Sequence, residues 1–410
     1  MRFDAIVIGG GAAGMIAAGR AAERGKRVPL LEKNKTLGEK LKITGGGRCN
    51  ITNAEPDERL FLKNYGNAEQ FLYSPFSQFG VKDTFSFFES RGLPLVIQEE
   101  NRVFPKTERA LDVARVLEKY MRDNGVAIKL GESVYRIVKK DNRVIGVVAG
   151  EHEYEADSVI LATGGLSHPE TGSTGEGFKW LLSLGHKVRK PTLALVPLAV
   201  KEDWVKKSAG TALDPVKITF FSEGKKIFFL RGRILLTHFG ISGPLILNAA
   251  GRVGDLLEEG AVAAAIDAYP DKNLGELEKW IIGIFDANKN KELKNVFKEI
   301  APQGIAARIL PLLSGIDQNI NVHSITKEQR KAIVHTLKAL PITITNLLGY
   351  DRAIVADGGV LLNEIDTRTM RSRLYENLFV VGDLLDINRP SGGYSLQLCW
   401  TTGYVAGSSV

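Results

Sequence analysis

Cysteine, long apolar runs and clustered charge are all scarce in this sequence. Only Cys49 and Cys399 are present, far apart and without the spacing of a disulfide framework or a zinc site, so no metal site is expected. No uninterrupted apolar run reaches the length of about 18 residues that a membrane-spanning helix needs. These absences argue against a disulfide-rich secreted protein and against a membrane protein, and they favour a reducing cytoplasm.

Basic residues are in modest excess but are not concentrated. The 54 lysines and arginines exceed the 47 acidic residues, which gives a net charge of +7. Basic neighbours occur as short doublets such as Lys139-Lys140 and Lys225-Lys226. This pattern favours a solvated basic surface over a nucleic-acid interface, so we expect a small-molecule ligand rather than a nucleic-acid partner.

The length and composition are those of a soluble globular protein. A chain of 410 residues has room for about two or three domains. Apolar residues make up 44% of the chain and charged residues 25%, both ordinary values for such a protein. The first expected strand begins almost at the N-terminus, which leaves no space for a cleavable signal. We therefore expect a cytoplasmic protein.

The most informative stretch is the beginning of the chain. Residues 5–8 form a short apolar run typical of a buried strand, and residues 15–24 show an alanine-rich helical pattern. Between them, Gly9, Gly11 and Gly14 form G-x-G-x-x-G, in which the first glycine makes a tight turn, the second lets backbone approach a pyrophosphate, and the third lets helix and strand pack closely. A second strand is expected at residues 27–31. The pattern predicts a dinucleotide-binding βαβ unit.

Glu32 closes the second strand of this unit. It follows Gly14 at close to the spacing of about 20 residues at which a carboxylate accepts hydrogen bonds from a ribose. An acidic residue at this position argues against a 2′-phosphate on the bound nucleotide.

Further glycine-rich turns follow other expected strands. Gly45, Gly46 and Gly47 are consecutive and predict a loop whose backbone lies against a flat ligand. A buried strand at residues 156–162 ends at Thr163-Gly164-Gly165, and the glycines of residues 172–177 open a helix that runs to Gly185.

The last part of the chain supplies a second candidate site. A strand at residues 377–381 ends in Gly382-Asp383. This segment resembles the strand that, in flavoproteins of this architecture, delivers an Asp to the ribityl hydroxyls or the pyrophosphate of FAD. Gly392-Gly393 then open a final helix through residue 406. The N-terminus of that helix would stabilise the negative charge that builds on the flavin ring during reduction.

The middle of the chain differs from both ends. Residues 66–125 are expected to be mostly helical, and strands are expected at 128–130, 133–138 and 144–148. Composition changes at Lys190-Pro191, after which strand-like pieces at 193–200, 216–221, 226–230 and 234–237 precede helical spacing over 272–313. We predict a discontinuous first domain of residues 1–190 and 346–410. A mainly β inserted domain would comprise 191–265 and 318–345, and a small helical domain 266–317.

Three motifs together resemble one bacterial flavoprotein family. They are residues 45–53 (GGGRCNITN), 237–244 (THFGISGP) and 385–394 (LDINRPSGGY). The chain resembles the HI0933-like (YhiN/BaiN-like, aminoacetone oxidase-like) FAD-dependent oxidoreductases over essentially its whole length. Two positions depart from that pattern: Asp383 stands where the family more often has Glu, and Ala356-Asp357-Gly358-Gly359 stands where it has Thr-x-Gly-Gly.

The resemblance implies an α/β fold, in which a glutathione-reductase-like Rossmann domain for FAD carries an inserted β-barrel-like domain and a small helical domain. It implies non-covalently bound FAD. Glu176 lies in a Thr-Gly-Glu-Gly element that is similar to the Thr-Gly-Asp-Gly of succinate dehydrogenase-type flavoproteins. The motif and the resemblance together give the expected cofactor-binding residues, which are Gly9, Gly11, Ala12, Ala13, Gly14, Glu32, Lys33, Lys40, Gly45, Gly46, Gly47, Arg48, Cys49, Asn50, Val134, Ala162, Thr163, Gly164, Gly165, Glu176, Gly382, Asp383, Gly392, Gly393 and Tyr394.

Three residues are candidates for catalysis, each with a structural alternative. Arg48 could pair with a pyrophosphate or a substrate carboxylate, or it could lie on the surface. His238 could act as a general acid or base because histidine titrates near neutral pH, but a structural role is at least as well supported. Tyr394 could cover the ring or donate to a substrate, or it could pack in the core. Cys49 could be a reactive thiol, although we favour a packing role because no partner cysteine is near it in sequence.

The expected function is hydride transfer between a small organic substrate and FAD. Only one G-x-G-x-x-G unit is present, so NAD(P)H, if it is the electron donor, would have to dock transiently. Oxidase and NAD(P)H-linked reductase both remain open, as do the substrate and the oligomeric state. The alternatives are a flavin-dependent enzyme that modifies RNA, which the basic isoelectric point of about 9.1 would suit, and a non-catalytic flavin-binding redox sensor.

Overall fold

The computed structural model describes residues 2–353 and 355–410. The chain divides into two compact units, Met1–Leu193 with Ala353–Val410, and Ala194–Arg352. Each is described by itself. Among the described residues, no helix combines the length and the apolar character that crossing a membrane requires.

The first unit is built on a mixed sheet that contains the first strand of the chain near its centre. The strand order is β6-β2-β1-β9-β8-β7, and β18 also pairs with β9. Pairing is parallel from β6 through β9 and to β18, and antiparallel between β9, β8 and β7. The strands are β1 (Arg2–Ile8), β2 (Pro29–Glu32), β6 (Ala127–Leu130), β7 (Val134–Lys140), β8 (Arg143–Ala149), β9 (His152–Leu161) and β18 (Leu378–Val380).

Helices and two small sheets complete this unit. The helices are α1 (Ala12–Glu23), α2 (Glu39–Ile43), α3 (Glu58–Lys63), α4 (Glu69–Gln78), α5 (Val81–Glu89), α6 (Ala110–Asp123), α7 (Glu176–Ser183) and α14 (Tyr394–Ser409). One small sheet contains β3 (Thr52–Asn53), β5 (Arg102–Pro105) and β4 (Leu95–Ile97), and the other contains β10 (Val188–Ala194) and β17 (Val355–Val360). The expectation that residues 66–125 are mostly helical is confirmed by α4, α5 and α6, and the short strands β4 and β5 are its exceptions. Their antiparallel pairing to each other and of β5 to β3 is a tertiary contact that a local helical pattern does not reveal.

The first and last helices of the chain pack against each other closely. The buried face of α1 is almost entirely alanine and glycine, so its backbone is accessible to a neighbour. On α14, a Cβ at Gly403 would lie 2.4 Å from the Ala13 carbonyl oxygen, and one at Gly407 would lie 2.4 Å from that of Ala17. Only glycine permits this approach, and it fixes α14 beside the turn that follows β1.

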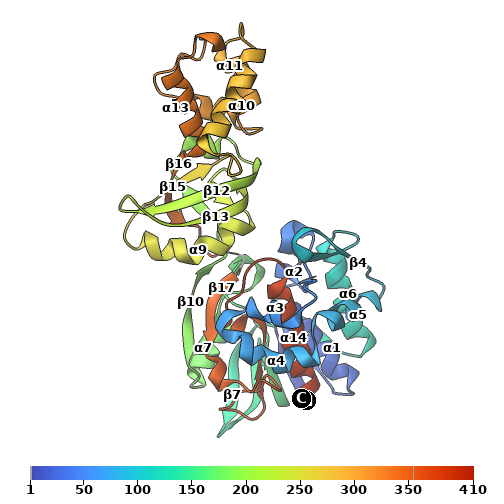
Figure 1. The fold of residues 1–410 in the computed structure, drawn as a ribbon. Coiled ribbons are helices and arrows are strands. Elements are labelled where there is room, and N and C mark those ends of the chain that lie inside the picture. Colours follow the sequence, from blue (N-terminus) through green and yellow to red (C-terminus); the bar gives the residue numbers. More distant parts are fainter. Residues whose placement is uncertain (1, 354) are drawn as a thin grey trace. The chain divides into compact units, whose positions relative to one another are not determined.

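The second unit is a closed barrel with helices attached. Its strand order is β11-β14-β13-β12-β15-β16, and β16 pairs with β11 to close it. Figure 1 shows α10, α11 and α13 gathered beyond one end of this barrel, while α9 packs on β13 and β16. The elements are β11 (Leu198–Val200), α8 (Asp203–Lys206), β12 (Ala212–Ser222), β13 (Lys225–Leu236), β14 (Gly240–Ser242), α9 (Pro244–Leu257), β15 (Val262–Asp267), α10 (Leu274–Ala287), α11 (Leu293–Ile300), α12 (Ala306–Ile309), α13 (Lys327–Lys338) and β16 (Leu340–Leu347).

One strand of the barrel is longer than expected. The pieces predicted at 226–230 and 234–237 form the single strand β13. Gly232 interrupts the apolar pattern between them, yet it pairs with Val216 of β12, next to a shift in register between Leu213 and Val216.

The close packing of α14 on α1 gives a testable prediction. In Gly407→Ala, the added methyl group would collide with the Ala17 carbonyl, and overpacking of this kind costs about 1–3 kcal/mol. Gly251→Ala, in the interior of α9, is the matched control, because its Cβ would meet no atom within 4 Å. We expect the first variant to lower the free energy of unfolding, and the second to raise it by up to about 1 kcal/mol through helix propensity. If urea unfolding showed the same change in the free energy of unfolding for both variants, the close packing of α14 on α1 would be contradicted.

Candidate functional site

The turn after β1 presents backbone rather than side chains. Gly9 has φ 106°, and its N–H donates to the Leu31 carbonyl at 2.9 Å. A Cβ on Gly14 would lie 1.8 Å from the Gly9 carbonyl oxygen, whereas one on Gly11 would meet no atom within 4 Å. Gly11 is also the N-cap of α1, and because it is a glycine it has no side chain that could accept from the first N–H groups of the helix. The first N–H groups of α1 are therefore available to an anion.

Glu32 ties this turn to the end of β2. Its Oε2 accepts a hydrogen bond from the Gly10 N–H at 2.6 Å, and its Oε1 accepts one from the Asn34 N–H at 2.7 Å. The side chain is buried. Each oxygen retains a lone pair, so the carboxylate can hold the turn and still accept from a ribose.

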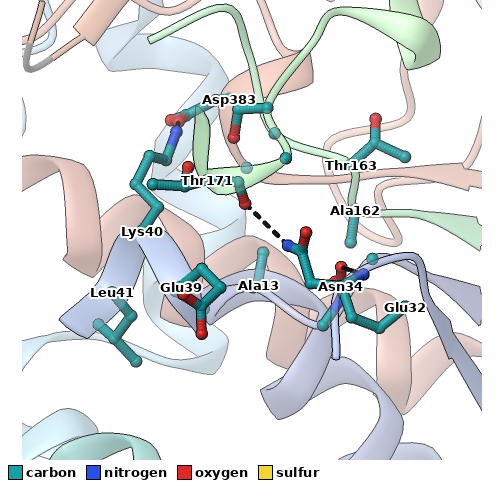
Figure 2. Close-up of a pocket in the computed structure, with 18 of the residues that line it drawn as sticks. Ala13, Glu32, Asn34, Glu39, Lys40, Leu41, Ala162, Thr163, Thr171 and Asp383 are labelled. Carbon is teal, nitrogen blue, oxygen red and sulfur yellow. Dashed lines mark hydrogen bonds and ion pairs between the residues drawn. The ribbon is translucent and has the colours of Figure 1, made fainter. Parts of the chain in front are cut away.

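A cavity of about 320 Å³ opens at the turn, and every residue that lines it belongs to the first unit (Figure 2). It joins segments from the beginning, the middle and the end of the chain. The expected cofactor-binding residues that line it are Gly9, Gly11, Ala12, Ala13, Glu32, Lys33, Lys40, Gly45, Gly46, Val134, Ala162, Thr163, Gly164, Glu176, Gly382 and Asp383. Two of them, Gly45 and Gly46, have left-handed φ values of 58° and 67°, which glycine adopts without strain.

Sequence reasoning missed other residues of the lining. They are Ile8, Gly10, Leu31, Asn34, Glu39, Leu41, Ile43, Thr44, Glu132, Ser133, His168, Thr171, Gly172, Ser173, Trp180, Val381, Ser395, Leu396 and Cys399. Most are neighbours in sequence of an expected residue. The stretch 171–173 carried a usable signal, because it begins the glycine-rich segment that we interpreted only as the start of a helix.

Residues 171–176 of that segment make hydrogen bonds and an ion pair with Lys33 and Asn34, which directly follow β2. Asn34 Nδ2 donates to the Thr171 carbonyl at 2.9 Å (Figure 2). Lys33 Nζ donates to Thr174 Oγ1 at 2.8 Å and pairs with Glu176 Oε2 at 2.7 Å. The Lys33 ammonium is therefore already neutralised by a carboxylate of the same cavity.

The remaining expected cofactor residues lie outside the lining. They are Gly14, Gly47, Arg48, Cys49, Asn50, Gly165, Gly392, Gly393 and Tyr394. Several of them support the lining from behind. Gly14 packs on Gly9, Gly165 lies against Asp383, and Gly393 packs on the backbone of Thr52, where a Cβ would come within 2.3 Å of the Thr52 carbonyl carbon. Asn50 Oδ1 accepts from the Val103 N–H at 3.2 Å.

The structure brings none of the three catalytic candidates into the lining of the cavity. Arg48 lies over the Phe104 ring at 4.4 Å and pairs with Glu108 at 3.4 Å. Tyr394 packs against the Phe61 ring with centroids 4.9 Å apart. His238 belongs to the second unit, on the exposed link between β13 and β14.

Both cysteines carry neutral thiols. Burial raises the pKa of Cys49 to about 12, against a smaller lowering by a hydrogen bond with Thr44. Burial and the nearby Asp383 carboxylate raise the pKa of Cys399 to about 12 as well. Because the thiolate is the nucleophilic form, the packing interpretation of Cys49 fits its surroundings better than a reactive thiol.

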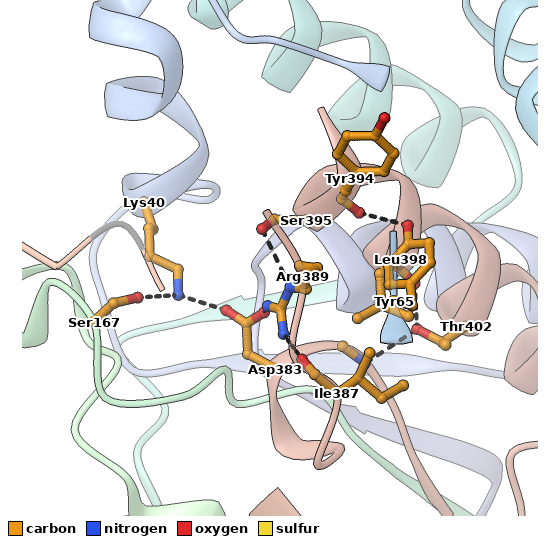
Figure 3. A network of polar contacts seen from close by, with 11 residues as sticks. Lys40, Tyr65, Ser167, Asp383, Ile387, Arg389, Tyr394, Ser395, Leu398 and Thr402 are labelled. Carbon is orange, nitrogen blue, oxygen red and sulfur yellow. Dashed lines mark hydrogen bonds and ion pairs between the residues drawn. The ribbon is translucent and has the colours of Figure 1, made fainter. Parts of the chain in front are cut away.

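Asp383 also lines the cavity and is the centre of a charge cluster (Figure 3). Lys40 Nζ approaches its Oδ2 at 2.9 Å and also donates to Ser167 Oγ at 3.2 Å. Arg389 Nη2 pairs with its Oδ1. Burial alone would raise the pKa of Asp383, but the two cations and their hydrogen bonds outweigh burial and hold it well below its usual range.

Comparison with known proteins places the chain in a family. The HI0933-like protein Rossmann domain family matches residues 3–409. The chain belongs to the HI0933-like family. It is 31% identical to the 3-dehydro-bile acid delta(4,6)-reductase of Clostridium scindens, covering 98% of this chain and 97% of that protein. It is also 27% identical to the ribosomal RNA dihydrouridine synthase of Escherichia coli (98% and 96% covered) and 28% identical to that of Haemophilus influenzae (99% and 98%).

Solved structures share the fold of this HI0933-like protein at low identity. A 3-ketosteroid delta1-dehydrogenase from Sterolibacterium denitrificans aligns with a TM-score of 0.57 at 14% identity, over 99% of this chain and 98% of that one. A flavocytochrome c3 fumarate reductase aligns with a TM-score of 0.51 at 17% identity, over 100% and 78%. These comparisons confirm the predicted fold class and the predicted enzyme class, an FAD-dependent oxidoreductase.

The Asp383 cluster gives a prediction on stability and its pH dependence. In Asp383→Asn, the buried Arg389 would lose its charged partner, and breaking a buried pair costs about 3–5 kcal/mol. The depressed pKa of Asp383 means that this contribution is fully present above its unfolded pKa of about 4 and is lost as the pH falls below that value.

We therefore expect the variant to be less stable than wild type near neutral pH, by a difference that shrinks at about pH 3 in urea unfolding. Asp157→Asn is the control, because Asp157 and its partner Arg2 are 49% and 70% exposed and exposed pairs contribute little. A stability loss that does not change with pH, or that is equal in both variants, would contradict the assignment.

Proposed function

We propose that this protein binds FAD non-covalently along the cavity and reduces a carbon–carbon double bond conjugated to a carbonyl group in a small organic substrate. The observation that carries the proposal is that one cavity is lined both by the turn after β1 and by the Gly382-Asp383 turn and the first residues of α14. FAD supplies the hydride when it is bound, and the protein supplies binding, orientation and charge.

The lining fits the phosphate end of FAD. A Cβ at Gly9 would lie 2.5 Å from the Ala162 carbonyl oxygen, and one at Gly14 would lie 1.8 Å from the Gly9 carbonyl oxygen, so neither position admits a side chain. A Cβ at Gly11 would meet no atom within 4 Å. The hydroxyl of Thr163 is buried and has no hydrogen-bond partner among the described residues. A buried polar group without a partner is costly, and a nucleotide in the cavity would satisfy it. We assign the pyrophosphate to the N–H groups at the start of α1.

The hydroxyl-bearing parts of FAD fit the two carboxylates. Glu32, at the β2 end, would accept from the adenosine ribose, and Asp383 would accept from the ribityl chain. Glu32 is buried and Asp383 is 12% exposed, and backbone or cationic donors hold each of them in one orientation. Arg48, His238 and Tyr394 stay our candidates for contact with the substrate.

The relatives support the type of reaction. The names of the two kinds of relative describe one chemistry, the saturation of a carbon–carbon double bond conjugated to a carbonyl. In such a step the hydride goes to the carbon β to the carbonyl and a proton to the α carbon, so the alkene is reduced and reduced FAD is oxidised. NADH or NADPH is the class of donor that we propose for the return of electrons.

Anaerobic spectroscopy tests this proposal. We expect NADH or NADPH to bleach the visible band of the bound flavin, and a conjugated enone added afterwards to restore it. The matched substrate is the same skeleton with its double bond moved out of conjugation, which should leave the flavin reduced because no carbonyl stabilises the developing charge. Failure of every enone in a panel, with reoxidation by oxygen alone, would favour an oxidase instead.

A second candidate function is the reduction of a uridine base in RNA. It is favoured by the ribosomal RNA dihydrouridine synthases, which align over nearly the whole chain. The β12–β13 hairpin also gathers basic side chains beside an exposed ring. Lys226 Nζ lies 4.7 Å and Lys217 Nζ 5.6 Å from the centroid of Phe229, whose side chain is about half exposed.

RNA retardation at several salt concentrations separates this second function from the first. If RNA binds through the hairpin, Lys225→Ala with Lys226→Ala should reduce the slope of log affinity against log salt by about 2, one for each lost phosphate contact. Lys289→Ala with Lys291→Ala, on the exposed link between α10 and α11, is the matched control and should leave the slope unchanged. No retardation of ribosomal RNA even at low salt would exclude this function.

A further inference from the structure

Arg389 is a buried arginine behind the cavity. It lies within the 385–394 motif that carries the family resemblance, but it is not among the expected site residues. Its side chain is 1% exposed, and all three of its nitrogens are engaged (Figure 3). Nη2 pairs with Asp383 Oδ1, Nε donates to Ser395 Oγ at 3.2 Å, and Nη1 donates to the Ile387 carbonyl at 2.7 Å. A guanidinium is a rigid fork, so three fixed partners leave it a single orientation.

Two of these partners line the cavity, although Arg389 itself does not. Asp383 follows β18 in the Gly382–Leu384 turn, and Ser395 lies in the first turn of α14. The third partner, Ile387, belongs to the link between those two elements. Arg389 therefore joins two chain segments that line the cavity, through the side chains of one lining residue on each.

We propose that Arg389 is a positioning residue for FAD, which holds the Asp383 carboxylate in one orientation and holds the Ser395 hydroxyl beside it. The inference rests on the proposed function, because it assumes that FAD occupies the cavity. Its mechanism is electrostatic and geometric: a carboxylate with one oxygen fixed by a buried cation presents its free lone pairs to a hydroxyl in a constant direction.

The groups around Asp383 leave this role to Arg389 rather than to Lys40. The charged and titratable groups that face the carboxylate are Lys40 from α2, Arg389 from the link before α14, and Cys399 from α14. Lys40 is 24% exposed and ends a flexible stem on a helix of five residues, so it can move away. Tyr65, the further titratable group near Arg389, carries a phenol whose pKa burial raises well above its usual range.

Loss of Arg389 has a distinctive consequence for pH dependence. Burial would then act on Asp383 with only Lys40 to oppose it, so the pKa of Asp383 would rise. A protonated carboxyl donates one hydrogen and accepts less well, which weakens its hold on a ribityl hydroxyl. FAD affinity should therefore become acid-sensitive in the variant over a range where wild type is insensitive.

The experiment compares FAD affinity of the full-length apo-protein, measured by flavin fluorescence, from neutral to mildly acidic pH. In Arg389→Met we expect about tenfold weaker binding at neutral pH, equivalent to the loss of one charge-assisted hydrogen bond, and a further loss on acidification. Arg389→Lys keeps the charge but not the fork, so it should restore the flat pH profile while binding remains weaker than in wild type. Arg189→Met, which removes an arginine that pairs with Asp386 and Asp357 and does not line this cavity, should bind as wild type does.

The outcomes separate this inference from the proposed function. If wild type binds no FAD, the proposed function and this inference both fail. If wild type binds FAD and Arg389→Met binds it equally well at every pH, only the inference fails. Equal weakening in Arg389→Met and Arg189→Met would also overturn it, because the effect would then be a general loss of structure. If Arg389→Met does not fold, the test uses Arg389→Lys and Ser395→Ala. We expect both variants to bind FAD more weakly than wild type, with an affinity that does not change with pH. If either variant departs from this result, the inference is wrong.

Discussion

The contact between the first and the last helix of the chain is the constraint on which the site depends. Gly403 and Gly407 let α14 approach the backbone of α1 so closely that a methyl group at either position would collide with a carbonyl oxygen. This contact places the turn after β1 and the Gly382-Asp383 turn beside one another, although they lie at opposite ends of the sequence. The Gly382 N–H adds to it by donating to Thr402 Oγ1 of α14 at 3.0 Å. Everything proposed for FAD follows from that adjacency.

Charge within the cavity is arranged around paired side chains. Lys33 and Lys40 line the cavity, and each is already paired, with Glu176 and with Asp383. The N–H groups at the start of α1 therefore become the principal attraction for a pyrophosphate, as expected for a site that works through the helix terminus. Pairing also holds the carboxylates in place, which suits them to accept hydrogen bonds from hydroxyl groups. The same pairing of opposite charges explains why a buried arginine, Arg389, lies behind Asp383.

The parts of the site that depend on residues close together in the sequence could be predicted. The turn around Gly9 and Gly14 and the position of Glu32 follow from spacing within one βαβ unit, and the HI0933-like motifs supplied the family. What could not be predicted depends on distant contacts. The attachment of residues 171–176 to Lys33 and Asn34 joins segments that share no local pattern. Tyr394 points to Phe61 because the glycine turn before it packs on Thr52, and Arg48 is drawn to Glu108, a partner far from it in sequence.

The most direct measurement is the identity and amount of flavin released when the purified protein is denatured. If the two ends of the chain form one cofactor cavity, the native protein should be yellow. Denaturation should then release intact FAD, close to one molecule for each chain, with no flavin left attached covalently. A colourless protein that also takes up no FAD on incubation would contradict the account, because the cavity would then exist without the ligand for which its glycines and carboxylates are arranged.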